Sequence, residues 1–282
     1  MTKLYFLTVN YNSSNLITRL IRSLPQKTDY QMIIVNNSAA DQDLYQLKHG
    51  FTTIIESEGN IGFGKACNLG LNWIYKQDNQ AIVWLINPDA YFKQDFVAKA
   101  IAFFHNHSQV SLLGTAVYNS EGEITSAGGE FIYGKAALST ITSFPLDSDQ
   151  DYFATAWVSG CSLLINLANF RECPLFCDRY FLYYEDLDFC LRYGQQGYQI
   201  AVTPLIKVFH DTSSISDRNI IWKYQHITHS YLIHVEKYGT TAVFWLTNIR
   251  MILNTARLLL VRPQEGWGKL VGWFNYWRTV KF

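Results

Sequence analysis

Three carboxylates, Glu185, Asp186 and Asp188, stand close together, and Arg192 follows Asp188 by one helical turn. The spacing of Asp188 and Arg192 favours an ion pair on one face of a predicted helix over residues 186–195. Negative charge is also favoured at a helix start, so the acids can serve as helix caps. The adjacent Glu185 and Asp186, flanked by aromatic residues, are in addition candidates for a general base held near a developing charge.

Two further side chains have the chemistry of metal ligands. Asn87-Pro88-Asp89 ends an apolar segment with a carboxylate, and His210 stands directly after a predicted strand. One Asp can provide one or two oxygen ligands to Mg²⁺ or Mn²⁺, and the remaining ligands come from a diphosphate and water. An imidazole can provide a further ligand. The alternatives are a turn at Asp89 that caps the next helix, and a structural role for His210.

A glycine-rich segment, Gly59–Lys65, separates the third predicted strand from a predicted helix. It resembles a phosphate-binding loop, but it lacks the Lys-Ser/Thr pair of a Walker A motif, and Cys67 breaks the GxGxxG pattern. The free N–H groups at the start of the helix could still bind a phosphate. The alternative is an ordinary turn and helix cap.

Alternating strands and helices must position these residues. Four short segments rich in β-branched or aromatic residues are predicted to be strands, at residues 4–10, 31–36, 51–56 and 81–86. Helices are predicted between them at 13–23 and 64–76, the second with an apolar stripe of Ala66, Leu69, Trp73 and Ile74. This alternation predicts a mostly parallel sheet that is covered on both faces.

The chain changes character after about residue 107. Gly- and Ser-rich turns separate three strand-like segments, which predicts an antiparallel extension of the sheet at 110–118, 129–133 and 156–165. A strand at 198–202 follows the helix over 186–195, and the chain is helical and aromatic from about 220. Small polar residues and glycines follow each of the first four strands. Since ligands bind at the carboxyl ends of strands in such sheets, we expect a nucleotide there.

Composition excludes several classes of protein. The 282 residues balance 23 Lys and Arg against 23 Asp and Glu, which excludes a nucleic-acid binder that works through a global basic field. An apolar content of 49%, with 16% aromatic residues, excludes a disordered chain. Five cysteines without a CxxC pair indicate neither a disulfide framework nor a zinc ribbon. With no signal peptide or membrane-spanning segment predicted, we expect a cytoplasmic protein.

Taken together, the motifs resemble those of glycosyltransferase family 2, and of its rhamnosyltransferase-like branch in particular. The resemblance covers residues 3–215 and depends on the order of these motifs: Val9–Asn12, Ile34–Ser38, Asn60–Gly64 with Asn68 and Gly70, Asn87–Asp89, Gly160, Tyr184–Asp188 with Arg192, and Gly197–Tyr198 leading to His210. It implies an α/β fold of the GT-A type, with a Rossmann-like, mostly parallel sheet, a smaller antiparallel extension and C-terminal helices. The implied units are a nucleotide-sugar-binding half over 1–106, an acceptor-binding and catalytic half over 107–219, and a helical segment over 220–282.

Members of this family transfer a sugar from a nucleotide diphosphate to an acceptor hydroxyl and invert the anomeric centre. The resemblance assigns the base- and ribose-facing wall to Thr8, Asn10, Tyr11, Asn36 and Asn37. It assigns the diphosphate side to Asn60, Gly62, Lys65 and Asn68. Asp89 would hold Mg²⁺ or Mn²⁺ with His210 as the second ligand. Asp186 would deprotonate the acceptor hydroxyl, with Glu185 as its helper or alternate.

This chain departs from the family pattern at two places. Asn87 replaces the usual first acid of the metal motif, and Asn36-Asn37 stand where many relatives have an Asp. The Asn-Pro-Asp form and the segment Asn60–Gly64 resemble the branch that uses dTDP-rhamnose to build cell-surface polysaccharide on a glycan or lipid-linked glycan. The alternatives are transfer of galactofuranose or glucose from a UDP-sugar, and a catalytically inactive sugar-nucleotide-binding subunit. A nucleotidyltransferase is disfavoured because no basic, Gly-rich loop follows the first strand.

The C-terminal segment concentrates positive charge. Residues 240–282 contain six basic residues, four tryptophans and one acid, so the rest of the neutral chain is acidic. On a helix, a narrow polar face would contain Thr247, Arg250, Asn254 and Arg257, which leaves a wide apolar face. Two interpretations stay open. The helices lie on an anionic membrane at the inner face of the plasma membrane, near a lipid-linked acceptor, or they pack on the catalytic domain or on a second subunit in a homodimer.

Overall fold

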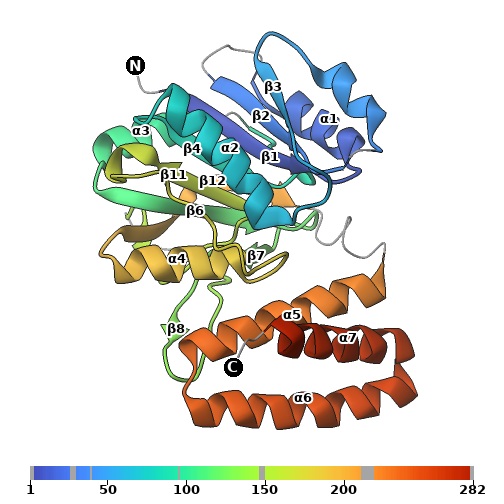
Figure 1. The fold of residues 1–282 in the computed structure, drawn as a ribbon. Helices are drawn as coiled ribbons and strands as arrows, with labels where there is room; N and C mark the ends of the chain where they lie inside the picture. Colours follow the sequence, from blue (N-terminus) through green and yellow to red (C-terminus); the bar gives the residue numbers. More distant parts are fainter. Residues whose placement is uncertain are drawn as a thin grey trace.

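The amino-terminal half of the sheet forms where strands and helices alternate in the sequence (Figure 1). The computed structural model describes residues 3–25, 30–38, 40–94, 96–145, 150–210 and 219–279. The first four strands are β1 (Leu4–Asn10), β2 (Tyr30–Asn36), β3 (Thr52–Glu56) and β4 (Ile82–Ile86). They lie parallel in the order β3-β2-β1-β4, so their carboxyl ends meet at one edge. The predicted parallel sheet is therefore confirmed.

The second half of the sheet continues beyond β4. It adds, in this order, β11 (Ser162–Asn166), β6 (Val110–Tyr118), β12 (Gln199–His210) and β10 (Phe153–Ala154). β11 is antiparallel to β4 and β6, whereas β12 is parallel to β6, so the extension is mixed. Two short strands pair at its rim, β5 (Ala90–Tyr91) with β12 and β7 (Ile124–Ser126) with β6. The predicted strand over 156–165 begins only at Ser162, because the preceding residues turn toward α4 (Glu185–Gln195) and bond to it at Gly160.

A separate two-stranded sheet corresponds to the predicted strand over 129–133. It consists of β8 (Phe131–Ile132) and β9 (Ala137–Leu138), which pair antiparallel. The sheet meets the C-terminal helices through bridges between Gly134 or Lys135 and Gly239. The predicted strand is thus shorter than expected and lies outside the main sheet.

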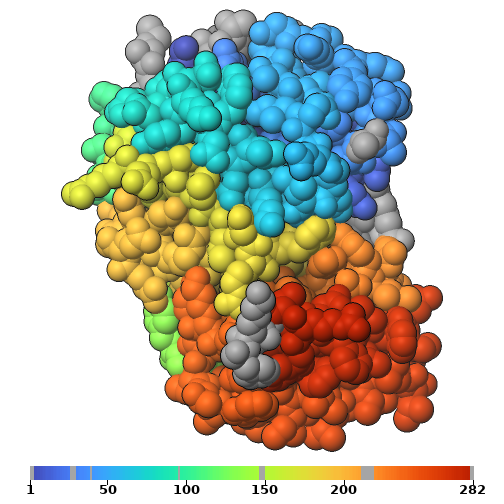
Figure 2. All heavy atoms as spheres, in the orientation of Figure 1, coloured from blue at the N-terminus to red at the C-terminus, as the bar shows by residue number. Residues whose placement is uncertain are grey.

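Three helices at the C-terminus form a unit of their own, α5 (Ile220–Tyr238), α6 (Thr241–Val261) and α7 (Pro263–Thr279). Figure 2 shows this unit, in orange and red, beneath the α/β body. The backbones of α5 and α7 approach closely, since a Cβ added to Gly268 or Gly272 would lie 2.5 or 2.3 Å from a carbonyl oxygen of α5. Lys281, one of the six basic residues within 240–282, lies outside the described residues. Among the helices that the structure describes, none is long and apolar enough to cross a membrane.

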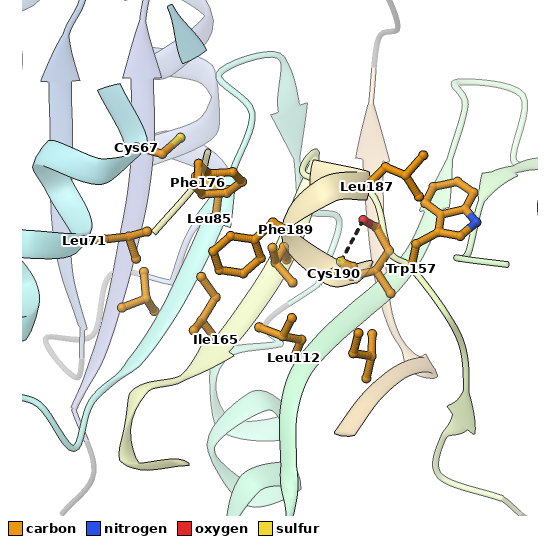
Figure 3. Packing of buried hydrophobic residues seen from close by; sticks show 14 of the residues in the cluster. Cys67, Leu71, Leu85, Leu112, Trp157, Ile165, Phe176, Leu187, Phe189 and Cys190 are labelled. Atoms are coloured by element: carbon orange, nitrogen blue, oxygen red, sulfur yellow. Dashed lines mark hydrogen bonds between the residues drawn. The ribbon is translucent and has the colours of Figure 1, made fainter. Parts of the chain in front are cut away.

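The remaining helices cover the two faces of the sheet. α2 (Phe63–Gln77) and α4 (Glu185–Gln195) pack on one apolar cluster, and α1 (Ser14–Ser23) and α3 (Val97–Asn106) pack on the other. Two short 3₁₀ helices, η1 (Gln42–Leu47) and η2 (Leu167–Asn169), complete the described elements. Figure 3 shows the first cluster, where the rings of Phe176 and Phe189 stack with centroids 4.4 Å apart. This packing fixes α4 against the body.

The apolar stripe expected on α2 is rotated in the structure. Leu69 is exposed and Trp73 is half-buried, whereas the buried residues are Gly64, Ala66, Cys67, Gly70, Leu71 and Ile74. Gly70 makes the closest approach to the sheet, because a Cβ there would lie 2.2 Å from the Leu7 side chain. The small residue Gly70 therefore determines which face of α2 packs on the sheet. The prediction of an apolar stripe was wrong at Leu69, which is exposed.

Candidate active site

A cavity of about 440 Å³ opens at the carboxyl ends of β1 and β4. Its lining comes from the sheet edge, the loop before α2, the start of α4, the end of β12 and the start of α5. Eight of the predicted site residues line it: Tyr11, Asn37, Asn60, Gly62, Asp89, Glu185, Asp186 and His210. Segments that are far apart in the sequence thus converge on one cavity.

Asp186 is held by two backbone donors at the start of α4. The N–H of Gly160 donates to Oδ2 at 2.8 Å, and the N–H of Leu187 donates to Oδ1 at 2.8 Å. A Cβ on Gly160 would lie 3.1 Å from the Cβ of Asp186, so the glycine permits this approach. Burial raises the pKa of Asp186, and the two hydrogen bonds limit the rise because they stabilise the carboxylate. The result is an oriented carboxylate in the cavity wall.

Glu185 differs from its neighbour in its surroundings. Its side chain is buried, and among the described residues no group hydrogen-bonds to Oε2. Burial, together with the negative charge of Asp186, raises the pKa of Glu185 to about 8. At neutral pH Glu185 therefore keeps its proton, and Asp186 carries the charge of the pair.

The unfolding free energy should fall as the pH rises from about 4.5 to about 8, because folded Glu185 keeps a proton that the unfolded chain loses. This one group changes the unfolding free energy by at most about 1.4 kcal/mol per pH unit. Glu185→Gln keeps a neutral side chain and should remove that contribution to the slope. Urea unfolding of both proteins across this range measures it, and equal slopes would contradict a proton held on buried Glu185.

The turn before α4 is strained and locked to the glycine-rich loop. Tyr183 and Tyr184 both adopt left-handed backbone conformations, with φ of 68° and 66°, which cost about 1–3 kcal/mol each. The N–H of Phe63 donates to the carbonyl of Phe181 at 2.8 Å. Gly62 has a φ of 91°, and a Cβ there would lie 2.6 Å from the same carbonyl oxygen. The loop before α2 and the carboxylates of α4 therefore have a fixed relative position.

Asp89 and His210 meet on the other side of the cavity. The Nε2 of His210 lies 2.9 Å from Oδ1 of Asp89, although 121 residues separate them. Antiparallel pairing of β5 with β12, with His210 opposite Ala90, brings them together. The Nδ2 of Asn87 lies 3.4 Å from the same imidazole nitrogen. Burial opposes protonation of His210, but the Cys161 sulfur and the Asp89 carboxylate favour it and raise the pKa of His210 to about 10.

The donor atoms at Asp89 and His210 fit a divalent metal that is bound only in part by protein. A carboxylate oxygen and a neutral imidazole nitrogen suit Mn²⁺, which would displace the proton that His210 otherwise keeps, and the carboxylate also suits Mg²⁺. Among the described residues no group of three or more His, Cys, Asp or Glu side chains could hold a metal ion. The further ligands would have to come from a bound diphosphate and water, because Asn87 provides no charge.

Several polar residues predicted to face the nucleotide lie behind the cavity wall. The amide of Asn10 donates to Asn36 at 3.1 Å, and the amide of Asn36 donates to Glu56 at 2.9 Å. Thr8, Asn10 and Asn36 are buried and are not part of the cavity lining. Asn37 does line the cavity, and its amide donates to Asn60 at 3.0 Å. Asn10 and Asn36 thus connect the ends of β1, β2 and β3 next to Asn37.

Lys65 and Asn68 also lie outside the cavity lining. Lys65 is exposed on α2. Asn68 anchors a neighbouring loop, because its Oδ1 accepts from the N–H of Phe176 at 2.7 Å and its Nδ2 donates to the carbonyl of Phe176 at 2.9 Å. Both residues lie on the side of α2 opposite the residues that pack on the sheet.

Sequence reasoning missed Trp222, which lines the cavity from α5. Its ring is parallel to that of Tyr11, with an interplanar angle of 7° and centroids 6.2 Å apart. Next to this pair, Phe181 stacks on His226 with centroids 4.5 Å apart. The only signal in the sequence was an aromatic residue near the start of a predicted helix. Further lining residues that were not predicted include Thr125, Ser126, Ser159 and Cys161.

The sequence of this chain is similar to those of known proteins. A model of glycosyl transferase family 2 matches residues 5–168. The hexosyltransferase Agl10 of low-salt glycan biosynthesis in Haloferax volcanii is 20% identical over 207 residues, a match covering 72% of this chain and 65% of that protein. The rhamnosyltransferase WbbL of Escherichia coli K12 is 21% identical over 218 residues, which covers 73% of this chain and 82% of the relative. The chain thus spans less than two thirds of the haloarchaeal protein.

Three solved structures resemble the fold. GalNAc-T7 with UDP, GalNAc and Mn²⁺ has a TM-score of 0.58 at 13% identity, and the match covers 74% of this chain and 44% of that one. The mannosyltransferase PcManGT of Pyrobaculum calidifontis with GDP-Man and Mn²⁺ has a TM-score of 0.54 at 11% identity, with coverages of 99% and 88%. TarS 1-349 of S. aureus has a TM-score of 0.52 at 16% identity, with coverages of 98% and 79%. At such identities the likeness is one of fold.

Proposed function

Because the chain belongs to glycosyl transferase family 2, we propose that it moves a sugar from a nucleoside-diphosphate sugar to a hydroxyl of a glycan or lipid-linked glycan, with inversion at the anomeric carbon. The GT-A fold that it shares with solved glycosyltransferases supports sugar transfer. The observation that carries the proposal is the cavity that contains both the oriented carboxylate of Asp186 and the Asp89–His210 pair. One group can accept a proton, and the other can hold a metal beside a diphosphate.

In the proposed reaction Asp186 takes the proton of the acceptor hydroxyl as its oxygen attacks the anomeric carbon. The two N–H donors keep the Asp186 carboxylate oriented, and Glu185 stays neutral beside it at neutral pH. Asp89 and His210 would hold Mg²⁺ or Mn²⁺, which would offset the charge of the departing nucleoside diphosphate. We assign Asn37, Asn60 and Gly62, which line the cavity, to the ribose and diphosphate side of the donor.

The donor that we propose is dTDP-rhamnose, and the product that we propose is a cell-surface polysaccharide. The similarity to an E. coli rhamnosyltransferase supports rhamnose, and the Asn87-Pro88-Asp89 motif agrees with it. Transfer of galactofuranose or glucose from a UDP-sugar is the alternative. We place donor binding in residues 1–106 and acceptor binding in 107–219, in a protein that works in the cytoplasm or at the inner face of the plasma membrane.

A nucleotide-sugar panel tests the choice of donor. The purified protein is mixed with dTDP-, UDP- and GDP-sugars in Mg²⁺ or Mn²⁺, and the thermal midpoint is recorded. A donor that binds the folded state should raise the midpoint, and dTDP-rhamnose should raise it most. If a UDP-sugar raises the thermal midpoint more than dTDP-rhamnose does, that UDP-sugar becomes the proposed donor. An absence of any shift across the panel would contradict donor binding at this cavity.

Trp222→Ala should weaken nucleoside-diphosphate binding by about tenfold, because stacking of a base on an aromatic ring contributes about 1–3 kcal/mol. The parallel rings of Trp222 and Tyr11 in the cavity lining carry this prediction. Calorimetric titration with dTDP and UDP measures the effect. Trp222→Phe should retain most of the affinity, and Trp267→Ala, an exposed tryptophan on α7, serves as the control. Equal affinities in Trp222→Ala and the control would remove Trp222 from the nucleotide site.

A further inference from the structure

The outermost helix, α6, presents its apolar side chains to solvent. Figure 1 shows α6 on the side of the helical unit that is furthest from the sheet. Its two buried side chains are polar, Asn248 and Thr255. Besides Val261 at its last position, seven large apolar residues of α6 are exposed: Trp245, Leu246, Ile249, Ile252, Leu253, Leu259 and Leu260. At 3.6 residues per turn these seven fall within an arc of about 140°, which we call the outward face.

The orientation of α6 is fixed by its polar contacts. The Oδ1 of Asn248 accepts from Nε1 of Trp273 at 3.0 Å, and its Nδ2 donates to the carbonyl of Phe244 at 2.9 Å. Close packing of Gly266 on the backbone of Leu258 and Leu259 joins α7 to the end of α6. Turning α6 to hide its apolar residues would break these contacts, so the outward face belongs to the folded unit.

Positive charge lies beside the outward face. Arg250 and Arg257 are exposed along one edge of it, seven residues apart and therefore nearly in line. The described part of the helical unit after residue 239 contains only one acid, Glu265, and that carboxylate lies 3.2 Å from Arg262. The surface next to the apolar residues is thus basic, and it complements an anionic partner.

We propose that α6 lies flat in the interface of an anionic membrane, with the outward face at the boundary of headgroups and acyl chains. A helix with a wide apolar face and a basic edge binds such surfaces through buried apolar area and electrostatic attraction. Trp245 is exposed on the outward face, and tryptophan is favoured at the membrane interface. A second copy fits the face less well, because an antiparallel two-fold contact would bring the arginines of both α6 helices together without acids between them.

This orientation has a consequence for catalysis, and that consequence rests on the proposed function. α5 carries Trp222 in the cavity wall and packs on α7, which in turn packs on α6. A membrane-bound α6 would therefore keep the cavity at a constant distance from the lipid surface. An acceptor sugar on a lipid could reach Asp186 from there, which favours a lipid-linked acceptor.

Sedimentation of the full chain with vesicles tests the proposal. The chain should bind vesicles that contain phosphatidylglycerol, bind phosphatidylcholine vesicles much more weakly, and dissociate at high salt. Leu253→Glu should reduce binding at least about tenfold, because a charge in the apolar face is costly. Arg250→Gln and Arg257→Gln should each reduce binding about fivefold, on anionic vesicles only. Ile132→Glu, an exposed apolar residue on β8, should bind like the native chain.

Two measurements keep the outcome clear. The thermal shift with donor should be the same in Leu253→Glu and the native chain, so a fault in folding or in the sugar site is detected separately. Quenching of tryptophan fluorescence by brominated lipids uses the unmodified chain and should occur on binding. Absence of vesicle binding by the native chain would overturn the proposal. A different result would show that a second copy covers the outward face: the native chain does not bind vesicles but forms dimers, and the Leu253→Glu substitution dissociates those dimers.

Discussion

Replacing Asp186 by Asn should lower kcat for sugar transfer about a hundredfold to ten-thousandfold, the usual contribution of a general base. The amide keeps the shape of the side chain and one acceptor oxygen for the N–H of Gly160 or Leu187, but it cannot take a proton. The dissociation constant of the nucleoside diphosphate should change by less than about threefold, since the base acts on the acceptor. Initial rates with saturating donor, together with calorimetric binding, separate the two effects.

Glu185→Gln is the matched control for this variant. The two acids are adjacent, yet Glu185 is already neutral near pH 7 because burial raises its pKa to about 8. Its amide replacement should therefore retain activity within about tenfold, well above the Asp186→Asn variant. Normal turnover by Asp186→Asn would remove Asp186 as the base, and an inactive Glu185→Gln would transfer that role to Glu185.

Asp89→Asn should lower kcat/KM for the donor about a hundredfold and raise the Mn²⁺ concentration needed for half-maximal rate, because the metal loses its charged protein ligand. The loss should be large since Asn87 supplies no second carboxylate nearby. His210 lies 2.9 Å from Asp89 and would be left, as a neutral imidazole, as the only one of the two proposed protein ligands. Titration of the initial rate with Mn²⁺ or Mg²⁺ measures the change.

The reverse substitution provides the comparison. Asn87→Asp adds a carboxylate beside the same pair and should lower the metal concentration needed for half-maximal rate, because a second anionic ligand strengthens a hard cation site. If neither Asp89→Asn nor Asn87→Asp changes the metal dependence, the metal is bound elsewhere or is not required. His210→Ala should resemble Asp89→Asn, but with a smaller effect, since the anionic ligand stays.

The buried strands could be predicted from the sequence because their apolar runs are continuous. β1 and β6 have the predicted bounds, since a strand that is buried on both faces must be apolar throughout. The polar residues at strand ends could likewise be placed at one edge, and Asp89 and His210 do meet there across 121 residues. For Asp89 and His210, the position of each residue at the end of a strand was enough to predict that they lie at the same edge of the sheet.

Side-chain directions outside the strands could not be predicted, because they depend on packing between distant elements. Lys65 ends the glycine-rich segment and Asn68 follows it, but both lie outside the cavity lining, on the side of α2 opposite Gly70, which packs on Leu7. Trp222 reaches the cavity only because α5 lies along it, which no local pattern encodes. The polar face of α6 was visible in the sequence, but glycines on α7 decide the packing that leaves the apolar face exposed.

The most direct test of sugar transfer follows the reaction by proton NMR. The native chain, a matched donor, a divalent metal and a glycan acceptor are incubated together, and the anomeric signals are recorded over time. We expect a loss of donor that requires acceptor, and a new glycosidic signal of the opposite anomeric configuration to the donor. A donor that binds in the thermal-shift panel yet stays unchanged with every acceptor would contradict it, and would identify an inactive sugar-nucleotide-binding subunit.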